Sequence, residues 1–322
     1  MAKQQLSQTP LERVIGQKSV VERLKVFARS ERRIPSLLLT SPAGYGKTRI
    51  TEAFAEEAGA TLHQINAVDI ENAAVLNHMV GKPCAEEGDD RKIIFIDESG
   101  EMRRRIGVAL LTALESPYRL ETRIRRKGKV EVWRIAIPDH VSFMFATTDV
   151  GKMHKALIDR CVHLQFDDYL QEELEEIASL YFKKHGFNPT PDALNNIARI
   201  SRSVRQLLQV CNCAMIFNNQ RFGESIVQKI LSQLQLTPSG LTKKDTKLLN
   251  YLADRNFASE RDCIAFLQVE KEEYIRMEGW LRKRGLVEVC SHGRYITTLG
   301  LEEIGVDAKM DDGSMFGIRI DA

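Results

Sequence analysis

The stretch SLLLTSPAGYGKTRITEAFAEEAG, residues 36–59, decides the fold of this chain. Residues 36–40 predict a buried strand, and residues 47–59 predict a helix. Between them, SPAGYGKT (41–48) follows the phosphate-loop pattern G-x-x-x-x-G-K-[ST], except that Ser41 stands where the first glycine belongs. A strand, a glycine-rich turn and a helix with its positive end at that turn predict an anion site in a parallel α/β sheet.

The residues that would contact phosphate are present in this loop. Gly44 and Gly46 would let backbone N–H groups close around phosphate oxygens, because neither carries a side chain. Lys47 would reach the β- and γ-phosphates, and Thr48 would ligate Mg²⁺. Ser41 only begins the turn, so we expect its effect to be modest. A single degenerate loop can also be a turn that binds nothing, and a second signal is needed.

KIIFIDES, residues 92–99, supplies that second signal. The apolar residues before Asp97 are typical of a central parallel strand that is covered on both faces. Asp97 at its end would hold Mg²⁺, and Glu98 would orient or deprotonate the attacking water, which is what phosphoryl transfer needs from a protein. The two motifs together predict a site for a nucleoside triphosphate.

The length of 322 residues predicts about two domains. The composition, 43% hydrophobic and 28% charged, is that of a folded protein. The net charge of +2 is small, so basic regions must be sought piece by piece. The sequence has no apolar run of membrane-spanning length and no signal core, so we expect a cytoplasmic protein without a membrane partner. The six cysteines form no C-x-x-C pair, and Cys211 and Cys213 are predicted to be reduced core thiols rather than zinc ligands.

The first half of the chain alternates predicted strands with helical patterns, as a parallel sheet with helices on both faces requires. The predicted strands are 36–40, 61–65, 93–97, 141–147 and 162–166. Four helical segments follow. After the linker LTPSG (236–240), three helices and a hairpin over 286–298 predict a winged helix.

These patterns predict four parts of the chain. They are an α/β nucleotide-binding core over 1–168, a helical lid over 169–236, a winged helix over 237–306 and a loosely held tail over 307–322.

Five further segments, described below in chain order, resemble the RuvB family of AAA+ ATPases, the motors of Holliday-junction branch migration. LERVIGQKSVVERLKVF (11–27) is similar to the opening of the family, where the I-G-Q turn borders the adenine pocket. FMFATTD (143–149) resembles the sensor-1 strand, and ALIDRC (156–161) the arginine-finger segment. DYLQEEL (168–174) resembles the start of the lid, and RSVRQLL (202–208) the sensor-2 helix. The resemblance runs over residues 11–304 and is patchy between 66 and 91.

The resemblance implies ATP and Mg²⁺ as cofactors. The implied catalytic residues are Lys47, Asp97, Glu98, Thr148 as γ-phosphate sensor, Arg160 as the finger and Arg205 as sensor 2, and the metal ligands are Thr48 and Asp97. The nucleotide-binding residues are Ile15, Gly16, Ala43, Gly44, Tyr45, Gly46, Lys47, Thr48, Arg49, Tyr169 and Arg205.

Two positions leave alternatives. Arg202 competes with Arg205 for the sensor role, and motif register favours Arg205. Asn66 could help to position Glu98, but a turn-forming asparagine is the favoured interpretation. Arg160 would act on the nucleotide of a neighbouring subunit, so the resemblance also implies a homo-oligomeric ring, a hexamer in our prediction.

RLETRIRRKGKVEVWRIAIP (119–138) predicts a β-hairpin inserted before the sensor strand, and RuvB carries a hairpin there that docks RuvA. Over 119–134 it holds seven basic residues against two glutamates. Bunched positive charge of this kind suits either a phosphate backbone or an acidic partner, and charge alone leaves both open. The predicted DNA or partner contacts are Arg123, Arg125, Arg126, Lys127 and Lys129 in this hairpin, with Arg282, Lys283, Arg284 and Arg294 in the winged helix.

Several departures mark a divergent member of the family. Ser41 replaces a glycine, a Phe-Gly pair expected after Arg160 is missing, and Val289 stands where a second wing arginine is expected. The predicted function is an ATP-hydrolysing oligomeric motor on DNA. Branched DNA is among the substrates that this prediction allows. The alternative is a protein-remodelling or clamp-loader-like ATPase whose hairpin and winged helix grip a partner protein.

Overall fold

The computed structural model describes residues 8–126, 129–217 and 222–306. The chain divides into two compact units, and each is described by itself. The first runs to Ile177 and includes Ser203–Arg205, whereas the second comprises Ala178–Arg202 and the residues from Gln206 onward. The predicted domain boundaries at 168 and 236 stay predictions. The predicted tail over 307–322, together with Lys127, lies outside the described residues.

A five-stranded parallel sheet forms the centre of the first unit, with strand order β2-β3-β6-β1-β7. Its strands are β1 (Leu37–Thr40), β2 (Thr61–Asn66), β3 (Lys92–Asp97), β6 (Val141–Thr147) and β7 (Val162–Gln165). The five predicted strands are confirmed. Because all strands run the same way, the loops that follow β1, β3 and β6 emerge at one edge of the sheet.

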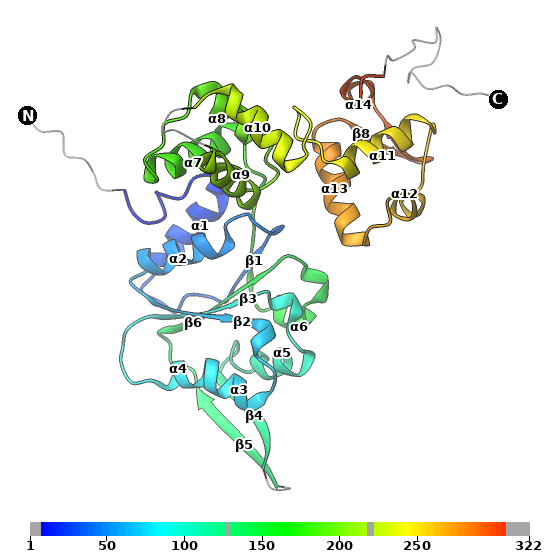
Figure 1. The fold of residues 1–322 in the computed structure, drawn as a ribbon. Helices are drawn as coiled ribbons and strands as arrows, with labels where there is room; N and C mark the ends of the chain where they lie inside the picture. The colour runs from blue at the N-terminus through cyan, green and yellow to red at the C-terminus, as the bar shows by residue number, and fades with distance from the viewer. Residues whose placement is uncertain (1–7, 127–128, 218–221, 307–322) are drawn as a thin grey trace, which may run out of the picture. The chain divides into compact units, whose positions relative to one another are not determined.

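Both faces of this sheet are covered, which explains its nearly continuous apolar strands. Successive residues of β3 alternate between two cores: Ile94 and Ile96 pack in one, and Ile93 and Phe95 in the other. Helices α1 (Lys18–Ala28) and α2 (Lys47–Glu57) contribute to the second core, and the first contains residues from the helices on the opposite face (Figure 1). These helices are α3 (Ala73–Leu76), α4 (Lys82–Ala85), α5 (Arg104–Leu111) and α6 (Lys155–Ile158).

The basic segment forms the predicted hairpin from β4 (Arg119–Arg126) and β5 (Lys129–Ala136). Its base is anchored on η2, a single π-helical turn over Asn77–Gly81. There the Thr122 hydroxyl donates to Asn77 Oδ1 at 2.8 Å, and Ile135 lies so close to Gly81 that a Cβ at that position would clash. Leu120 is fully buried beside them.

The helical lid contains the four predicted helices. They are α7 (Gln171–Lys184), which spans the division between the units, α8 (Pro191–Arg199), α9 (Val204–Ile216) and α10 (Glu224–Leu234). In the second unit they are followed by α11 (Lys243–Ala253), α12 (Glu260–Leu267), α13 (Lys271–Lys283), the hairpin β8 (Val287–Cys290) and β9 (Gly293–Ile296), and α14 (Thr298–Glu303).

The predicted order of three helices and a hairpin is confirmed, and it closes on its own core around Leu248, Tyr274 and Leu281. Helix α14 was not predicted. Among the described helices, none has the length and apolar character that crossing a membrane would require.

Candidate active site

The two sequence motifs meet at the edge of the sheet where its strands end. Thr40 of β1 pairs with Thr147 of β6, and β6 lies between β1 and β3 in the sheet. The Thr48 hydroxyl, at the start of α2, donates to Asp97 Oδ2 at 3.3 Å. A hydroxyl and a carboxylate that are far apart in sequence therefore form one oxygen-rich position, as the two motifs predicted.

The turn that precedes α2 depends on its glycines. Gly44 and Gly46 have φ values of +83° and +86°, in the left-handed region that side chains rarely adopt. A Cβ on Gly44 would lie 2.7 Å from Arg205 Cβ and 3.1 Å from the Ser203 hydroxyl oxygen. Glycine at 44 is therefore needed for the close approach of the segment that carries Arg205, as well as for the turn.

Lys47 is buried, and its ammonium group is held by the start of the loop. It donates to the Ser41 carbonyl at 2.9 Å, to the Ser41 hydroxyl at 3.2 Å and to the Pro42 carbonyl at 3.3 Å. Burial lowers the pKa of Lys47 from its ordinary value, although the carboxylates of Glu98 and Asp97 oppose that change. The serine that replaces the usual glycine thus adds a hydroxyl acceptor for the lysine.

The carboxylate pair after β3 is held in a constrained turn. Glu98 has a φ of +50°, and its N–H donates to Asp97 Oδ1 at 2.9 Å. A glutamate in the left-handed region costs on the order of 1 kcal/mol, and such residues cluster at functional sites. Asn66, the alternative helper, caps a short turn by accepting from Val68 N at 3.1 Å, as the favoured interpretation predicted.

Thr148 follows β6 directly and is exposed, whereas the neighbouring Thr147 is buried. The Thr147 hydroxyl donates to the Asp149 carbonyl and accepts from the Asp149 N–H, both at 3.0 Å. Thr147 is therefore occupied within the loop, and Thr148 keeps the exposed position that a phosphate sensor needs.

Tyr169 forms one wall beside the loop. A Cβ on Gly16, which has a φ of +71°, would lie 2.8 Å from the Tyr169 ring, so this turn packs directly against the tyrosine. The Tyr169 hydroxyl donates to the Tyr45 carbonyl at 3.1 Å. The Tyr45 hydroxyl in turn donates to Asp168 at 2.7 Å, and burial raises the pKa of Tyr45, which keeps it protonated as a donor.

Sequence reasoning missed two of these connections. Asp168 was quoted in the motif that includes Tyr169 but was given no role. Gln17 completes the I-G-Q turn and forms two hydrogen bonds with Asp167, at 2.7 Å to its carbonyl and 2.9 Å from its N–H. Pairs separated by this much sequence leave no local pattern. The predicted Ile15 is half-buried and Ala43 is exposed, and Arg49 is exposed and pairs with Glu52 at 3.3 Å.

Arg160, the predicted finger, lies between α6 and β7 and is engaged within its own chain. Its Nε is 2.7 Å from Glu115 Oε1, and its Nη1 donates to the Ala156 carbonyl at 2.5 Å. The side chain is 26% exposed and Glu115 is 56% exposed, so this pair lies at the surface and is open to exchange.

The competing arginines take different positions. Arg205 belongs to the first unit, where it approaches Gly44 and its charge acts on Lys47. Arg202 instead belongs to the second unit and forms an ion pair with Asp245. This geometry favours Arg205 for the sensor role, as motif register did.

The predicted DNA or partner contacts divide by exposure. Arg123, Lys129, Arg282 and Lys283 are exposed. The side chains of Arg125 and Arg126 and the whole of Lys127 lie outside what the structure describes.

Two of the predicted contacts, Arg284 and Arg294, are engaged within the second unit, and their contact with DNA or a partner stays a prediction. Arg284 donates to the Ser239 carbonyl and lies over the Trp280 ring. Arg294 donates to Glu278 at 2.6 Å and to Glu260 at 2.8 Å, and only 18% of its side chain is exposed. Both side chains are used to hold the domain together, which favours structural roles over DNA contact.

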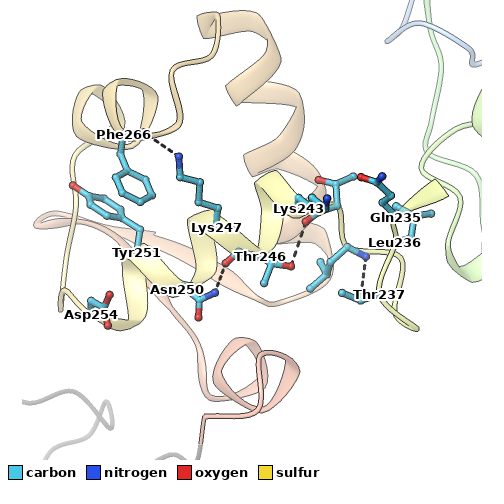
Figure 2. A pocket seen from close by; sticks show the side chains of 12 residues that line it. Gln235, Leu236, Thr237, Lys243, Thr246, Lys247, Asn250, Tyr251, Asp254 and Phe266 are labelled. Atoms are coloured by element: carbon cyan, nitrogen blue, oxygen red, sulfur yellow. Dashed lines mark hydrogen bonds between the residues drawn. The ribbon is translucent and has the colours of Figure 1, made fainter. Parts of the chain in front are cut away.

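A groove of about 670 Å³ runs along α11 in the second unit, and none of the residues that line it is a predicted site residue (Figure 2). Tyr251 and Phe266 stack at its wall with ring centroids 4.0 Å apart, and Lys247 lies 4.9 Å above Phe266. Nothing in the sequence patterns indicated it.

Both the P-loop region and nearly the whole chain are similar to known proteins. Residues 6–165 match the family described as the Holliday junction DNA helicase RuvB P-loop domain. The chain is 29% identical over 317 residues to the Holliday junction branch migration complex subunit RuvB of Campylobacter fetus subsp. fetus, which covers 93% of this chain and 89% of that protein. With the RuvB subunit of Campylobacter hominis it shares 27% over 328 residues, covering 97% and 93%.

Solved structures share the fold. The Thermotoga maritima RuvB Holliday junction branch migration motor superposes with a TM-score of 0.71 at 20% identity, covering 91% of this chain and 96% of that one. A mutant of the same protein gives a TM-score of 0.74 at 21% identity, with 94% and 99% covered.

Proposed function

The chain is a RuvB-like AAA+ ATPase whose P-loop domain belongs to the RuvB family, and on this premise we propose that it is an oligomeric DNA motor driven by ATP hydrolysis. The observation that carries the proposal is the meeting of Lys47, Thr48 and Asp97 at the edge of the sheet. The match to RuvB subunits over nearly the whole chain favours a motor over the clamp-loader-like or protein-remodelling alternative.

The site residues fit ATP and its metal. The backbone of Gly44–Thr48 would bind the phosphates at the start of α2, where the helix dipole favours anions. Thr48 and Asp97 offer the oxygen ligands that Mg²⁺ prefers, and the ion would neutralise charge on the phosphate oxygens. Lys47 would exchange its Ser41 acceptors for phosphate oxygens, and Glu98 would orient the attacking water.

Assembly is part of the proposal. Arg160 would leave Glu115 and reach the nucleotide of a neighbouring subunit, which requires a ring or a filament. We propose a ring, with six subunits, because each site would then be completed by the next subunit. A finger supplied in this way contributes about 10³–10⁵ in rate, so its loss should abolish turnover and spare binding.

The hairpin is proposed as the dock for a partner protein. Its second strand exposes Val130, Val132 and Trp133 at 59%, 44% and 43%. Val132 lies directly across the strand pair from Arg123, so apolar and basic side chains share one surface. A DNA backbone would gain little from exposed valines, whereas an acidic protein surface with an apolar patch, of RuvA type, would use both.

DNA binding is assigned to the winged-helix domain, with Arg282 and Lys283 at the end of α13 as its exposed cations. Branched DNA is the proposed substrate, as it is for the relatives named above. We also propose a cytoplasmic location, where such DNA is processed. The free thiols agree with a reducing compartment: Cys211 is buried and Cys213 is half-buried.

The test is steady-state ATP hydrolysis without DNA, with linear duplex and with a four-way junction. Lys47→Ala serves as the blank, because it removes the phosphate contact. Stimulation that is strongest on the junction supports the proposal. Hydrolysis that ignores DNA, or duplex binding with no dependence on salt, overturns it, since phosphate contacts release counterions.

A further inference from the structure

Two arginines three residues apart belong to different sites: Arg202 lies just before α9, and Arg205 is in its first turn. Arg205 approaches the phosphate loop at Gly44. Arg202 binds Asp245, the residue that completes the capping box of α11 in the winged-helix domain. Three residues span at most about 10 Å, so the backbone that carries Arg205 cannot move far from the backbone that carries Arg202.

The Arg202 contact is a built one. Asp245 is fully buried, and it also accepts from the Thr242 N–H and hydroxyl at 2.6 and 2.5 Å. The Arg202 guanidinium lies over the Trp280 indole, 3.9 Å from the ring centroid, and donates to the Gly240 carbonyl at 3.4 Å. An arginine can stack and pair at once because its guanidinium is planar, and lysine cannot.

A second observation shows that this junction is tightly fitted. Gly240, in the linker before α11, has a φ of +85°, and a Cβ there would lie 2.8 Å from Ile200 Cα. The linker therefore packs backbone to backbone against the residue that ends α8. Together, Arg202 and Gly240 fix the winged-helix domain to the lid helices within the second unit.

We propose that Arg202 is a coupling residue that transmits the nucleotide state sensed at Arg205 to the winged-helix domain. The inference rests on the proposed ATP-driven motor and deepens it. Arg202 touches neither phosphate nor DNA in this scheme. It is a positioning residue, and its loss should separate ATP turnover from the response of the winged helix.

The experiment compares the native chain with Arg202→Gln, Arg202→Lys and Asp245→Asn. Asparagine keeps the capping acceptor of α11 and loses the charge, so it guards against a variant that only unfolds. Arg199→Gln is the matched control, because Arg199 is an exposed arginine three residues away whose hydrogen bonds, within the described part of the chain, go to Asn196 and the Pro238 carbonyl. Melting temperature confirms that each variant is folded.

The first readout needs no DNA. Amide hydrogen exchange over residues 243–296 is measured with and without a non-hydrolysable ATP analogue. In the native chain and in Arg199→Gln the analogue should change exchange at α11. In Arg202→Gln it should not, while affinity for the analogue stays within about threefold of native and Arg202→Lys recovers the response only in part.

The second readout is DNA movement per ATP hydrolysed, which should fall about fivefold or more in Arg202→Gln and Asp245→Asn. The inference is overturned if these variants keep the native exchange response, or if native chain shows none. It is also overturned if Arg202→Gln loses analogue binding, because Arg202 would then act at the nucleotide. If the native chain responds to the analogue but moves no DNA, the proposed motor is wrong. The exchange measurement alone then decides whether Arg202 couples the two sites.

Discussion

The hydroxyl of Ser41 accepts from the Lys47 ammonium at 3.2 Å, beside the Ser41 carbonyl at 2.9 Å. The carbonyl is the closer acceptor, and a glycine at this position would keep it. A substitution in the loop can thus be absorbed when the contact that matters belongs to the backbone.

Ser41→Gly should therefore change nucleotide affinity by less than about tenfold, or 1.4 kcal/mol. Lys47→Ala, which removes the ammonium, should abolish binding or turnover. Titration with a fluorescent ATP analogue measures the nucleotide affinity of both variants, and steady-state ATP hydrolysis measures their turnover. A larger loss in Ser41→Gly would mean that the hydroxyl positions the lysine and does more than add an acceptor.

The pair of Arg160 and Glu115 competes with use of the finger by a neighbouring subunit. A surface pair of this kind contributes at most about 1 kcal/mol, a factor of about five. Glu115→Gln should raise ATP turnover by up to that factor at limiting protein concentration. Arg160→Ala, measured alongside, should show no ATP turnover. Reduced turnover in Glu115→Gln would show that the glutamate positions the finger instead of withholding it.

Arg294→Ala should destabilise the winged helix, because the buried carboxylate of Glu278 loses its cationic partner and keeps, among the described residues, only the Tyr274 hydroxyl as a donor. We expect a loss on the order of 2 kcal/mol, reduced from the buried-pair value because Arg294 is 18% exposed. Urea unfolding measures it, with exposed Arg276→Ala as control. Unchanged stability with a smaller salt slope of DNA binding would return Arg294 to the DNA-contact set.

Elements were easier to predict than side-chain partners. Strand β3 was predicted because its apolar run and terminal carboxylates are local signals. The segment over 66–91 was not, since its turns are each only a few residues long and carry no periodicity. The partners of Arg294 lie 16 and 34 residues away, so the same sequence that predicted the wing could not predict that its arginine is used internally.

The β4–β5 hairpin carries a prediction of its own. The double variant Val130→Thr with Val132→Thr should weaken partner binding and leave DNA affinity unchanged, because threonine keeps the β-branched shape and removes apolar contact. Arg125, Arg126 and Lys127 replaced together by Ala should weaken the partner as well. Pull-down of a RuvA-type partner and salt titration of duplex binding measure the two. Loss of DNA affinity in the arginine variant alone would make the hairpin a DNA arm.

At the scale of the whole molecule, a site completed by a neighbour can be tested by mixing. Lys47→Ala and Arg160→Ala should each be inactive alone. Mixed in equal amounts, about a quarter of the interfaces would pair an intact lysine with an intact finger, so up to about a quarter of native ATP turnover should return. A mixture as inactive as its components would mean that Arg160 does not act between subunits.

Among its described residues, the hairpin packs on the body of the first unit at its base, through Leu120, Thr122 and Ile135. The side chains of residues 129–134 in β5 are exposed, so substitutions there should not disturb the folding of the sheet. Natural selection can therefore rewrite them freely, and a lineage can exchange one partner for another while its motor is inherited unchanged. Grafting this hairpin onto a relative should carry the choice of partner with it.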